Sequence, residues 1–253
     1  MGTYGQAATH RWALNPLNWR QAQMKYDAYY KKIDLIKSFL TNQTNFAFVR
    51  FGDGELGVID GKDQIRPEWK WLSCENRYKI LREELIQSLQ YTHPNYYIGI
   101  EPGMADIVGH DRLQYYYNLS GQNEKHILTA NLFVNQNYLI FRKDVIPLFN
   151  KYTVFAVCQE NSNIENLPFP IERHFFCHEN AWEVDYYLKY QLINHSIKHK
   201  GCLYLFMAGP FSNILTHNLH KVNQENIYLD IGSPLDPFLF NENTRGYLRI
   251  YNQ

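Results

Sequence analysis

The sequence predicts an α/β protein with a Rossmann-like, mostly parallel sheet and helices on both faces. Segments typical of strands alternate along the chain with segments typical of helices. The strand-like segments are continuous apolar runs, as expected for strands that are buried on both sides. With 253 residues, 45% of them hydrophobic, the chain is long enough to bury a sizeable core.

The first half of the chain begins with an arm, residues 1–18, that has little structure of its own. A helix is expected over 19–40, because this stretch contains neither Gly nor Pro. Strands are expected over 46–51, 95–102 and 126–134, and helices over 75–90, over 110–119 and from the third strand to about residue 149. We expect residues 1–45 to form an N-terminal arm and helix, and residues 46–253 to form a single α/β domain.

The second half of the chain continues the same alternation. Strands are expected over 152–159, 171–178, 202–209 and 226–232, of which 202–209 is the most apolar. Residues 160–170 form a loop, judged by their Asn and Pro content, and helices are expected over 179–197 and 211–222. In such sheets ligands bind at the carboxyl ends of the strands, so the residues just after each strand are the candidates for chemistry.

Charge and cysteine content narrow the function classes. Lys and Arg together number 25, as do Asp and Glu, and there is no basic run, so we expect no nucleic-acid partner. We expect no transmembrane segment, because no apolar run approaches the roughly 18–20 residues needed. The N-terminus lacks the apolar core of a signal peptide, and the four cysteines show no CxxC spacing. These features predict a cytoplasmic protein with buried, unpaired cysteines.

The strand at 46–51 ends in Gly52, Asp53, Gly54 and Glu55. If this stretch is extended, the two carboxylates point to the same side and repel unless a cation lies between them. Hard oxygen ligands suit Mg²⁺ or Mn²⁺, and the two glycines leave space for a ligand to approach. The alternative is that Asp53 caps the following helix and Glu55 is a solvated acid in its first turn. Arg50 is either the neutralising partner of these acids or a clamp for a diphosphate.

The segment MAGPFSN, residues 207–213, breaks an apolar strand at Gly209 and places Pro210 at the start of a helix. Free N–H groups at the helix N-terminus would bind phosphate, with Ser212 and Asn213 as further donors. The alternative is an ordinary strand-to-helix turn. Because neither a GxGxxG nor a Walker pattern is present, P-loop kinases and dinucleotide-binding enzymes are disfavoured.

The histidines of RHFFCHEN, residues 173–180, raise the question of zinc. His174 and His178 fall on one face of the expected strand, but no second Cys or His pair complements them. Histidines that are buried or at a sheet edge and satisfied by hydrogen bonds are therefore favoured over a zinc site.

In this order, the motifs resemble the glycosyltransferases of the GT-D fold. The motifs that carry the resemblance are RFGDGE, then Asn180-Ala181-Trp182 at a helix start, then Gly209-Pro210, then Asp230-Ile231-Gly232. The resemblance implies that Asp53 and Glu55 form a DxE motif that binds Mn²⁺ or Mg²⁺, which holds the diphosphate of a nucleotide sugar. It runs from about residue 46 to 239. This sequence departs from the family at Ser233, where we would expect His, so donor sugar and acceptor need not be shared.

The resemblance implies a metal-dependent glycosyltransferase, a hexosyl- or pentosyltransferase, that uses a nucleotide-diphosphate sugar, with UDP as the family-based expectation. The acceptor is a glycan hydroxyl, and its proton needs a base if the anomeric centre inverts. The candidate bases are Asp236, which is favoured, and Glu179, Glu101 and Asp230. Arg245 is a further candidate for phosphate or acceptor contact, from its charge and its place after the last strand. Two alternatives are a non-catalytic module that binds carbohydrate or nucleotide, and a metal-dependent phosphoesterase.

Overall fold

The computed structural model describes residues 31–100 and 110–251 and confirms the predicted α/β sheet. Seven strands form one sheet in the order β5-β4-β1-β9-β8-β6-β7, and every neighbouring pair is parallel. The strands are β1 (Ala47–Phe51), β4 (Tyr96–Ile100), β5 (Ile127–Thr129), β6 (Val154–Gln159), β7 (Arg173–Cys177), β8 (Leu203–Phe206) and β9 (Ile227–Asp230). A separate antiparallel hairpin pairs β2 (Gln64–Ile65) with β3 (Lys70–Trp71).

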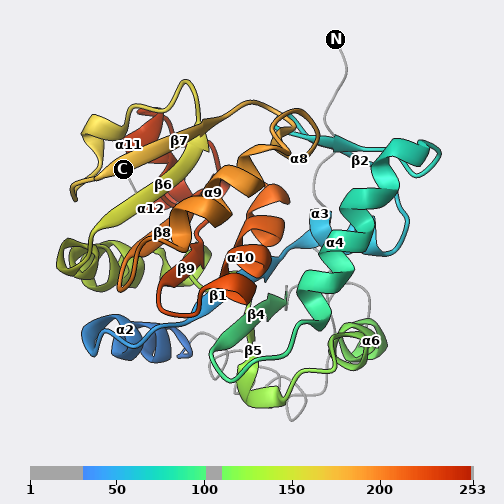
Figure 1. The fold of residues 1–253 in the computed structure, drawn as a ribbon, viewed down its shortest axis with the longest axis horizontal. Helices are drawn as coiled ribbons and strands as arrows, with labels where there is room; N and C mark the ends of the chain where they lie inside the picture. The colour runs from blue at the N-terminus through green and yellow to red at the C-terminus, as the bar shows by residue number, and fades with distance from the viewer. Residues whose placement is uncertain (1–30, 101–109, 252–253) are drawn as a thin grey trace.

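Helices cover both faces of the sheet, as Figure 1 shows. One face carries α3 (Asp53–Ile59), α4 (Lys79–Gln90), α6 (His110–Ser120), α8 (Ala181–Val184), α9 (Leu188–Ser196) and α10 (Phe211–Val222). The other carries α2 (Ile33–Thr41), the helical run α7 (Tyr138–Ile140), η4 (Phe141–Val145) and η5 (Ile146–Lys151), then α11 (Asp236–Leu239) and α12 (Gly246–Tyr251). Single 3₁₀ turns are η1 (Asn76–Tyr78), η2 (Glu124–His126), η3 (Asn135–Asn137) and η6 (Ile164–Asn166).

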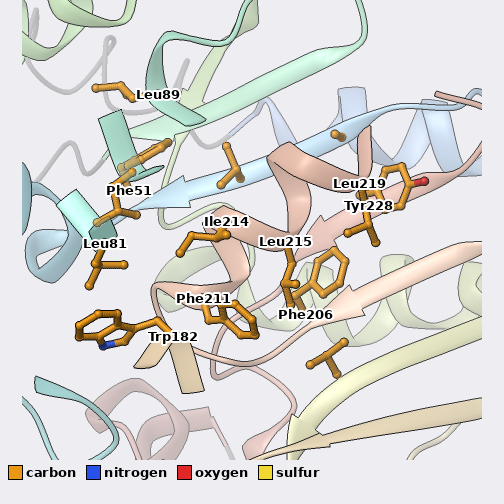
Figure 2. Packing of buried hydrophobic residues seen from close by; sticks show 14 of the residues in the cluster. Phe51, Leu81, Leu89, Trp182, Phe206, Phe211, Ile214, Leu215, Leu219 and Tyr228 are labelled. Atoms are coloured by element: carbon orange, nitrogen blue, oxygen red, sulfur yellow. The ribbon is translucent and has the colours of Figure 1, made fainter. Parts of the chain in front are cut away.

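The two cores follow from the alternation of side chains along β1. Val49 and Phe51 point into the core beneath α10, whereas Phe48 points into the core on the α2 side. Figure 2 shows the apolar side of α10 packed against the sheet, where Phe211 and Leu215 lie close to strand residues. Burial of such runs on both sides is the main stabilisation of a parallel sheet.

The element boundaries differ from the sequence prediction in three places. The strand expected over 126–134 ends at Thr129, and the helical run that follows is divided into short segments. Pro147, which has no N–H, lies at the start of the last of them, η5. The helix expected over 179–197 is broken at Asp185, whose carboxylate accepts a hydrogen bond from the backbone N–H of His178. The helix α3 was expected only under the alternative interpretation of Asp53 and Glu55, and the hairpin and the two short C-terminal helices were not predicted.

Three of the four cysteines, Cys158, Cys177 and Cys202, are buried and unpaired as expected, whereas Cys74 is exposed. No helix among the described residues has the length and hydropathy needed to cross a bilayer. The division of the chain at residue 45 stays a prediction. Helix α2, which precedes it, packs in the same core as the sheet, and Tyr152 donates its hydroxyl proton to the carbonyl of Leu40 at 2.6 Å. The expected arm, residues 1–18, lies outside the described residues.

Candidate functional site

A cavity of about 850 Å³ opens at the carboxyl ends of the strands, which is the place that the sequence predicts for a ligand. Its wall is built from residues that follow β1, β6, β7, β8 and β9, together with the β2–β3 hairpin and the segment before α12. Among the predicted site residues, those that line it are Arg50, Gly52, Asp53, Glu55, Gly209, Asp236 and Arg245.

Arg50 is held at the junction of β1 and β9 by Asp230. The backbone N–H of Arg50 donates to Oδ2 of Asp230 at 3.0 Å, and Nε of Arg50 lies 3.4 Å from Oδ1. The guanidinium passes over Gly232, where a Cβ atom would lie 1.9 Å from Nη2 of Arg50 and where φ is +70°. Glycine is therefore required at position 232, because a side chain would overlap the guanidinium and because φ is positive. Burial raises the pKa of Asp230, and the neighbouring Arg50 opposes this shift.

Asp230 itself does not line the cavity, which corrects its candidacy as the base. Its carboxylate is buried and its oxygens face Arg50. The structure gives it the role of fixing Arg50, whose guanidinium is partly exposed in the cavity wall.

Glu55 folds back on its own helix. The chain after β1 is not extended, because helix α3 begins at Asp53, so the prediction that the two carboxylates share one side of an extended strand is wrong. Oε2 of Glu55 accepts the N–H of Gly52 at 3.0 Å, which is the half of a capping box that a glutamate at the third helical position supplies. Burial raises the pKa of Glu55 to about 7, with a further contribution from Asp230 and an opposing one from Arg50.

Asp53 is the outward carboxylate of the pair. Its side chain is 63% exposed and forms an ion pair of 2.6 Å with Nη2 of Arg66 on the hairpin. The alternative interpretation placed the cap on Asp53 and a solvated acid at Glu55, and the structure reverses these two roles. Both carboxylates nevertheless line the cavity.

The glycines at this site leave room for protein atoms, which corrects the expectation that they leave room for a ligand. A Cβ atom at Gly52 would lie 3.1 Å from Oε2 of Glu55. A Cβ atom at Gly54 would lie 2.7 Å from the Trp69 ring, and one at Gly209, where φ is +56°, would lie 3.1 Å from the same ring. The indole of Trp69 therefore packs over both turns and joins the hairpin to the floor of the cavity.

The start of α10 does not present side chains to the cavity. Pro210 precedes the helix as predicted, but Ser212 and Asn213 are buried. Oγ of Ser212 accepts the N–H of Ala208 at 3.0 Å, and the amide of Asn213 donates to the carbonyl of Arg50 at 2.8 Å. These contacts correct the expectation that Pro210, Ser212 and Asn213 bind a phosphate. The contact of Asn213 instead ties β1 to the helix.

Of the remaining candidate bases, Asp236 lines the cavity and Glu179 does not. Asp236 accepts the hydroxyl of Thr244, and burial raises its pKa to about 6 against the opposing effects of Thr244 and Arg245. Glu179 is exposed, and Glu101 lies outside the described residues. Nη2 of Arg245 pairs with Oε1 of Glu68 at 2.9 Å, so Arg245 takes part in a charged network at the cavity.

Sequence reasoning missed one group that lines the cavity, and it considered the other, His178, only as a residue after a strand and as a possible zinc ligand. The hairpin contributes Arg66, Glu68 and Trp69, but strands of two residues leave no pattern to detect. His178 follows β7, where its Nδ1 lies 3.0 Å from Oδ1 of the buried Asp185. The prediction of a hydrogen-bonded edge histidine is confirmed for His178, and the position of this residue after a strand was the available signal.

At the β1 end, the cavity lining offers the carboxylates of Asp53 and Glu55 as metal ligands. Nowhere in residues 31–100 or 110–251 do three or more His, Cys, Asp or Glu side chains converge as a metal cluster. Mg²⁺ and Mn²⁺ are commonly bound by one or two carboxylates, with water and substrate phosphates completing the shell. Asp53 and Glu55 fit a cation of this kind, which arrives with a phosphate ligand, and do not fit a cation held by protein ligands alone.

No protein-family model and no curated protein matches the sequence. Solved structures match over most of the chain. One is described as a new glycosyltransferase (DUF1792) from Streptococcus sanguinis, with a TM-score of 0.58, 15% identity, and coverage of 81% of this chain and 82% of that one. Another, described as a domain of unknown function 1792 with a distinct glycosyltransferase fold, has a TM-score of 0.56, 16% identity, and coverage of 81% and 79%. The chain has a glycosyltransferase fold. At this identity the likeness establishes the fold, and the fold resemblance read from the motifs is confirmed.

Proposed function

We propose that this chain is a metal-dependent glycosyltransferase that moves a sugar from a nucleotide-diphosphate sugar, expected to be a UDP-sugar, to an acceptor hydroxyl. One observation carries the proposal. In a glycosyltransferase fold, a single cavity at the carboxyl end of β1 gathers Arg50, Asp53, Glu55 and Arg66. Two cations and two carboxylates at the rim of a parallel sheet suit a diphosphate and the ion that accompanies it.

The arginines would bind the diphosphate. Arg50 is anchored by Asp230, so its guanidinium is held in place before a ligand arrives. Arg66 is on the exposed hairpin and pairs with Asp53. An exposed ion pair is worth about 0–1 kcal/mol, so a phosphate can take over this guanidinium at little cost. Planar guanidinium groups bind phosphate oxygens in pairs, which favours arginine for this task.

Asp53 would be the first ligand of a divalent cation, and Glu55 the second. When bound, such an ion acts as a Lewis acid that stabilises the charge on the departing diphosphate. Asp53 presents an exposed carboxylate in the cavity wall. Glu55 has a pKa raised to about 7 by burial, so it holds a proton for part of the time at neutral pH and a nearby cation favours its charged form.

The two alternative functions make different demands on the same cavity. A metal-dependent phosphoesterase usually needs a cluster of several Asp and His ligands, and the described part of the chain contains no group of three. A non-catalytic binding module would need the cavity but not the acids. Only turnover separates that module from an enzyme.

The test is to incubate the protein with a panel of nucleotide sugars, including UDP-glucose, UDP-galactose and UDP-xylose, and to measure the slow release of nucleoside diphosphate. We expect release from one or a few of them with MnCl₂, loss of release with EDTA, and recovery when Mn²⁺ is added back. Binding without release would support the binding module. Release of inorganic phosphate from simple phosphate esters would support the phosphoesterase. Full activity in EDTA would rule out the metal mechanism.

A further inference from the structure

The cavity has two ends that differ in chemistry. The end at β1 and the hairpin carries Arg50, Asp53 and Arg66. We call the end beyond β6 the neutral end, because its lining from the loop after that strand consists of amides and a hydroxyl: Gln159, Asn161, Ser162, Asn163 and Asn166. The carboxylate of Glu160, in the same loop, is not part of this lining and lies 3.6 Å from Nε2 of His178. Uncharged amides suit the hydroxyl groups of a saccharide, whereas a diphosphate requires cations. The two ends therefore match the two ligands of a glycosyl transfer.

His178 stands at the neutral end. It follows β7, lines the cavity, and its side chain is 58% exposed. The loop after β6 is fixed beside it, because the N–H of Glu160 donates to the carbonyl of Cys177 at 3.1 Å. The imidazole is thus accessible from the cavity, and the loop beside it is held in place by a backbone hydrogen bond.

Both carboxylate oxygens of Asp185 are hydrogen-bonded to His178. Oδ2 accepts the backbone N–H of His178 at 2.6 Å, and Oδ1 lies 3.0 Å from Nδ1 of the ring. The Asp185 side chain is 3% exposed. A buried carboxylate accepts hydrogen bonds, so it selects the tautomer that carries the proton on Nδ1 and leaves the lone pair on Nε2.

The hairpin joins this end of the cavity to the charged end. The N–H of Asn180, two residues beyond His178, donates to the carbonyl of Glu68 at 2.8 Å, and the Asn180 side chain accepts the N–H of Lys70 at 3.2 Å. Figure 1 shows α8, which begins after Asn180, close to the hairpin. The same hairpin carries Arg66, which pairs with Asp53. His178 is therefore placed against the element that reaches the proposed diphosphate site.

We propose that the neutral end of the cavity is the acceptor subsite, that it takes an uncharged saccharide, and that Nε2 of His178 is the base in the transfer. This inference rests on the proposed function. The acceptor oxygen forms a bond to the anomeric carbon, and its proton passes to Nε2. The bond between the anomeric carbon and the diphosphate oxygen breaks, and its electron pair leaves with the diphosphate. Asp185 is a positioning residue that stabilises the imidazolium.

Two charged groups govern the titration of His178. Asp185 raises the pKa of the ring by its hydrogen bond and by its charge, and Glu160, whose Oε2 is 3.6 Å from Nε2, raises it further. A protonated imidazole cannot accept the acceptor proton, so turnover falls as the pH drops through this pKa. Asp185→Asn removes the charge of the carboxylate, lowers the pKa of His178 and shifts this acid limb to lower pH.

Asp236 is the competing base in the same cavity, but it lies in the charged network of Arg245 and Glu68. The decisive experiment compares His178→Gln, Asp185→Asn and Asp236→Asn with the wild type. The assay uses the UDP-sugar from the panel that is hydrolysed fastest, with MnCl₂, and p-nitrophenyl glycosides as acceptors. His174→Gln is the matched control, because His174 is on β7, the strand that His178 follows, and does not line the cavity.

For His178→Gln we expect turnover to fall by about a hundredfold or more, with the Kd of UDP unchanged within about twofold. Asp185→Asn should move the acid limb to lower pH, and the imidazole signals of His178 in NMR should move with it. His174→Gln should retain full turnover. Retained turnover in His178→Gln would overturn the proposal, as would an acid limb that Asp236→Asn removes and His178→Gln does not. Wild-type protein that neither binds UDP nor turns over any donor would instead overturn the proposed function, and the base with it.

Discussion

The two ends of the cavity differ in how their functional groups are held. At the β1 end, acids and arginines are paired with each other, as in Arg50 with Asp230 and Arg66 with Asp53. At the β6–β7 end, the amides of the loop after β6 line the cavity together with one imidazole that a buried carboxylate orients. A site that binds a highly charged donor and an uncharged acceptor needs charged side chains for the first and uncharged polar side chains for the second. The comparison predicts that charge changes at the first end alter donor binding most strongly.

The largest effect is expected from Asp53→Ala. It removes the most exposed acid of the proposed cation site, so sugar transfer should fall by about a hundred- to a thousandfold or disappear. Folding should be unaffected, because the change breaks only the exposed pair with Arg66. The initial rate of donor release measures the effect. Asp34→Ala on α2 is the control, an acid away from the cavity. Unchanged turnover in Asp53→Ala would exclude a role for this carboxylate.

The second-largest effect is expected when the buried ion pair of Arg50 and Asp230 is broken. Arg50→Met leaves the carboxylate of Asp230 buried and unpaired, which should cost about 3–5 kcal/mol of unfolding free energy. The double variant Arg50→Met/Asp230→Asn should recover most of that loss. Urea denaturation measures both. Arg66→Met breaks an exposed pair and should cost less than about 1 kcal/mol. Equal losses for the two arginines would contradict the distinction between an anchored and a movable guanidinium.

Glu55 should make stability depend on pH. Its pKa is raised from 4.5 to about 7 by burial, so the fold favours the protonated form. This contribution is complete below pH 4.5 and is lost as the pH rises through about 7. Relative to Glu55→Gln, which stays neutral, the wild type should lose about 3 kcal/mol over that range, by urea denaturation at several pH values. Glu83→Gln, an exposed acid on α4, is the control. Parallel pH profiles for the wild type and Glu55→Gln would show that Glu55 is not buried.

Glu55→Ala differs from Asp53→Ala in a further way. Because Glu55 caps the N–H of Gly52, its removal should also destabilise the protein by about 0.5–2 kcal/mol.

The smallest effect is expected from Arg245→Gln. Its pair with Glu68 is exposed, so the unfolding free energy should change by less than about 1 kcal/mol. The Kd of UDP should rise if Arg245 adds to the positive charge at this end, and a calorimetric titration measures it. A loss of several kcal/mol in stability would show that the pair is structural.

Much of the fold could be predicted from the sequence, because the strands are apolar runs that only a sheet covered on both faces can bury. Helix α10 was predicted with its bounds, since Gly209 and Pro210 mark its start. The short helical segments after Thr129 could not be predicted, because the division of this part of the chain depends on packing as well as on Pro147.

The site was predicted in part. The order of motifs indicated that Arg50, Asp53 and Glu55 lie at one edge of the sheet, and all three line the cavity. Their geometry was wrong, because the helix starts at Asp53 and turns Glu55 inward. The contact between His178 and Asp185 could not be read either, since it depends on the turn through Asn180, which has a positive φ of 57°.

The most direct test of the central claim is the Kd of UDP, measured by calorimetry for the wild type with MnCl₂, for the wild type with EDTA, and for Asp53→Ala with MnCl₂. We expect binding with Mn²⁺, and binding at least about tenfold weaker, or about 1.4 kcal/mol, in the other two conditions. The same Kd in all three conditions, or no binding in any of them, would contradict a cation-assisted diphosphate site at Asp53.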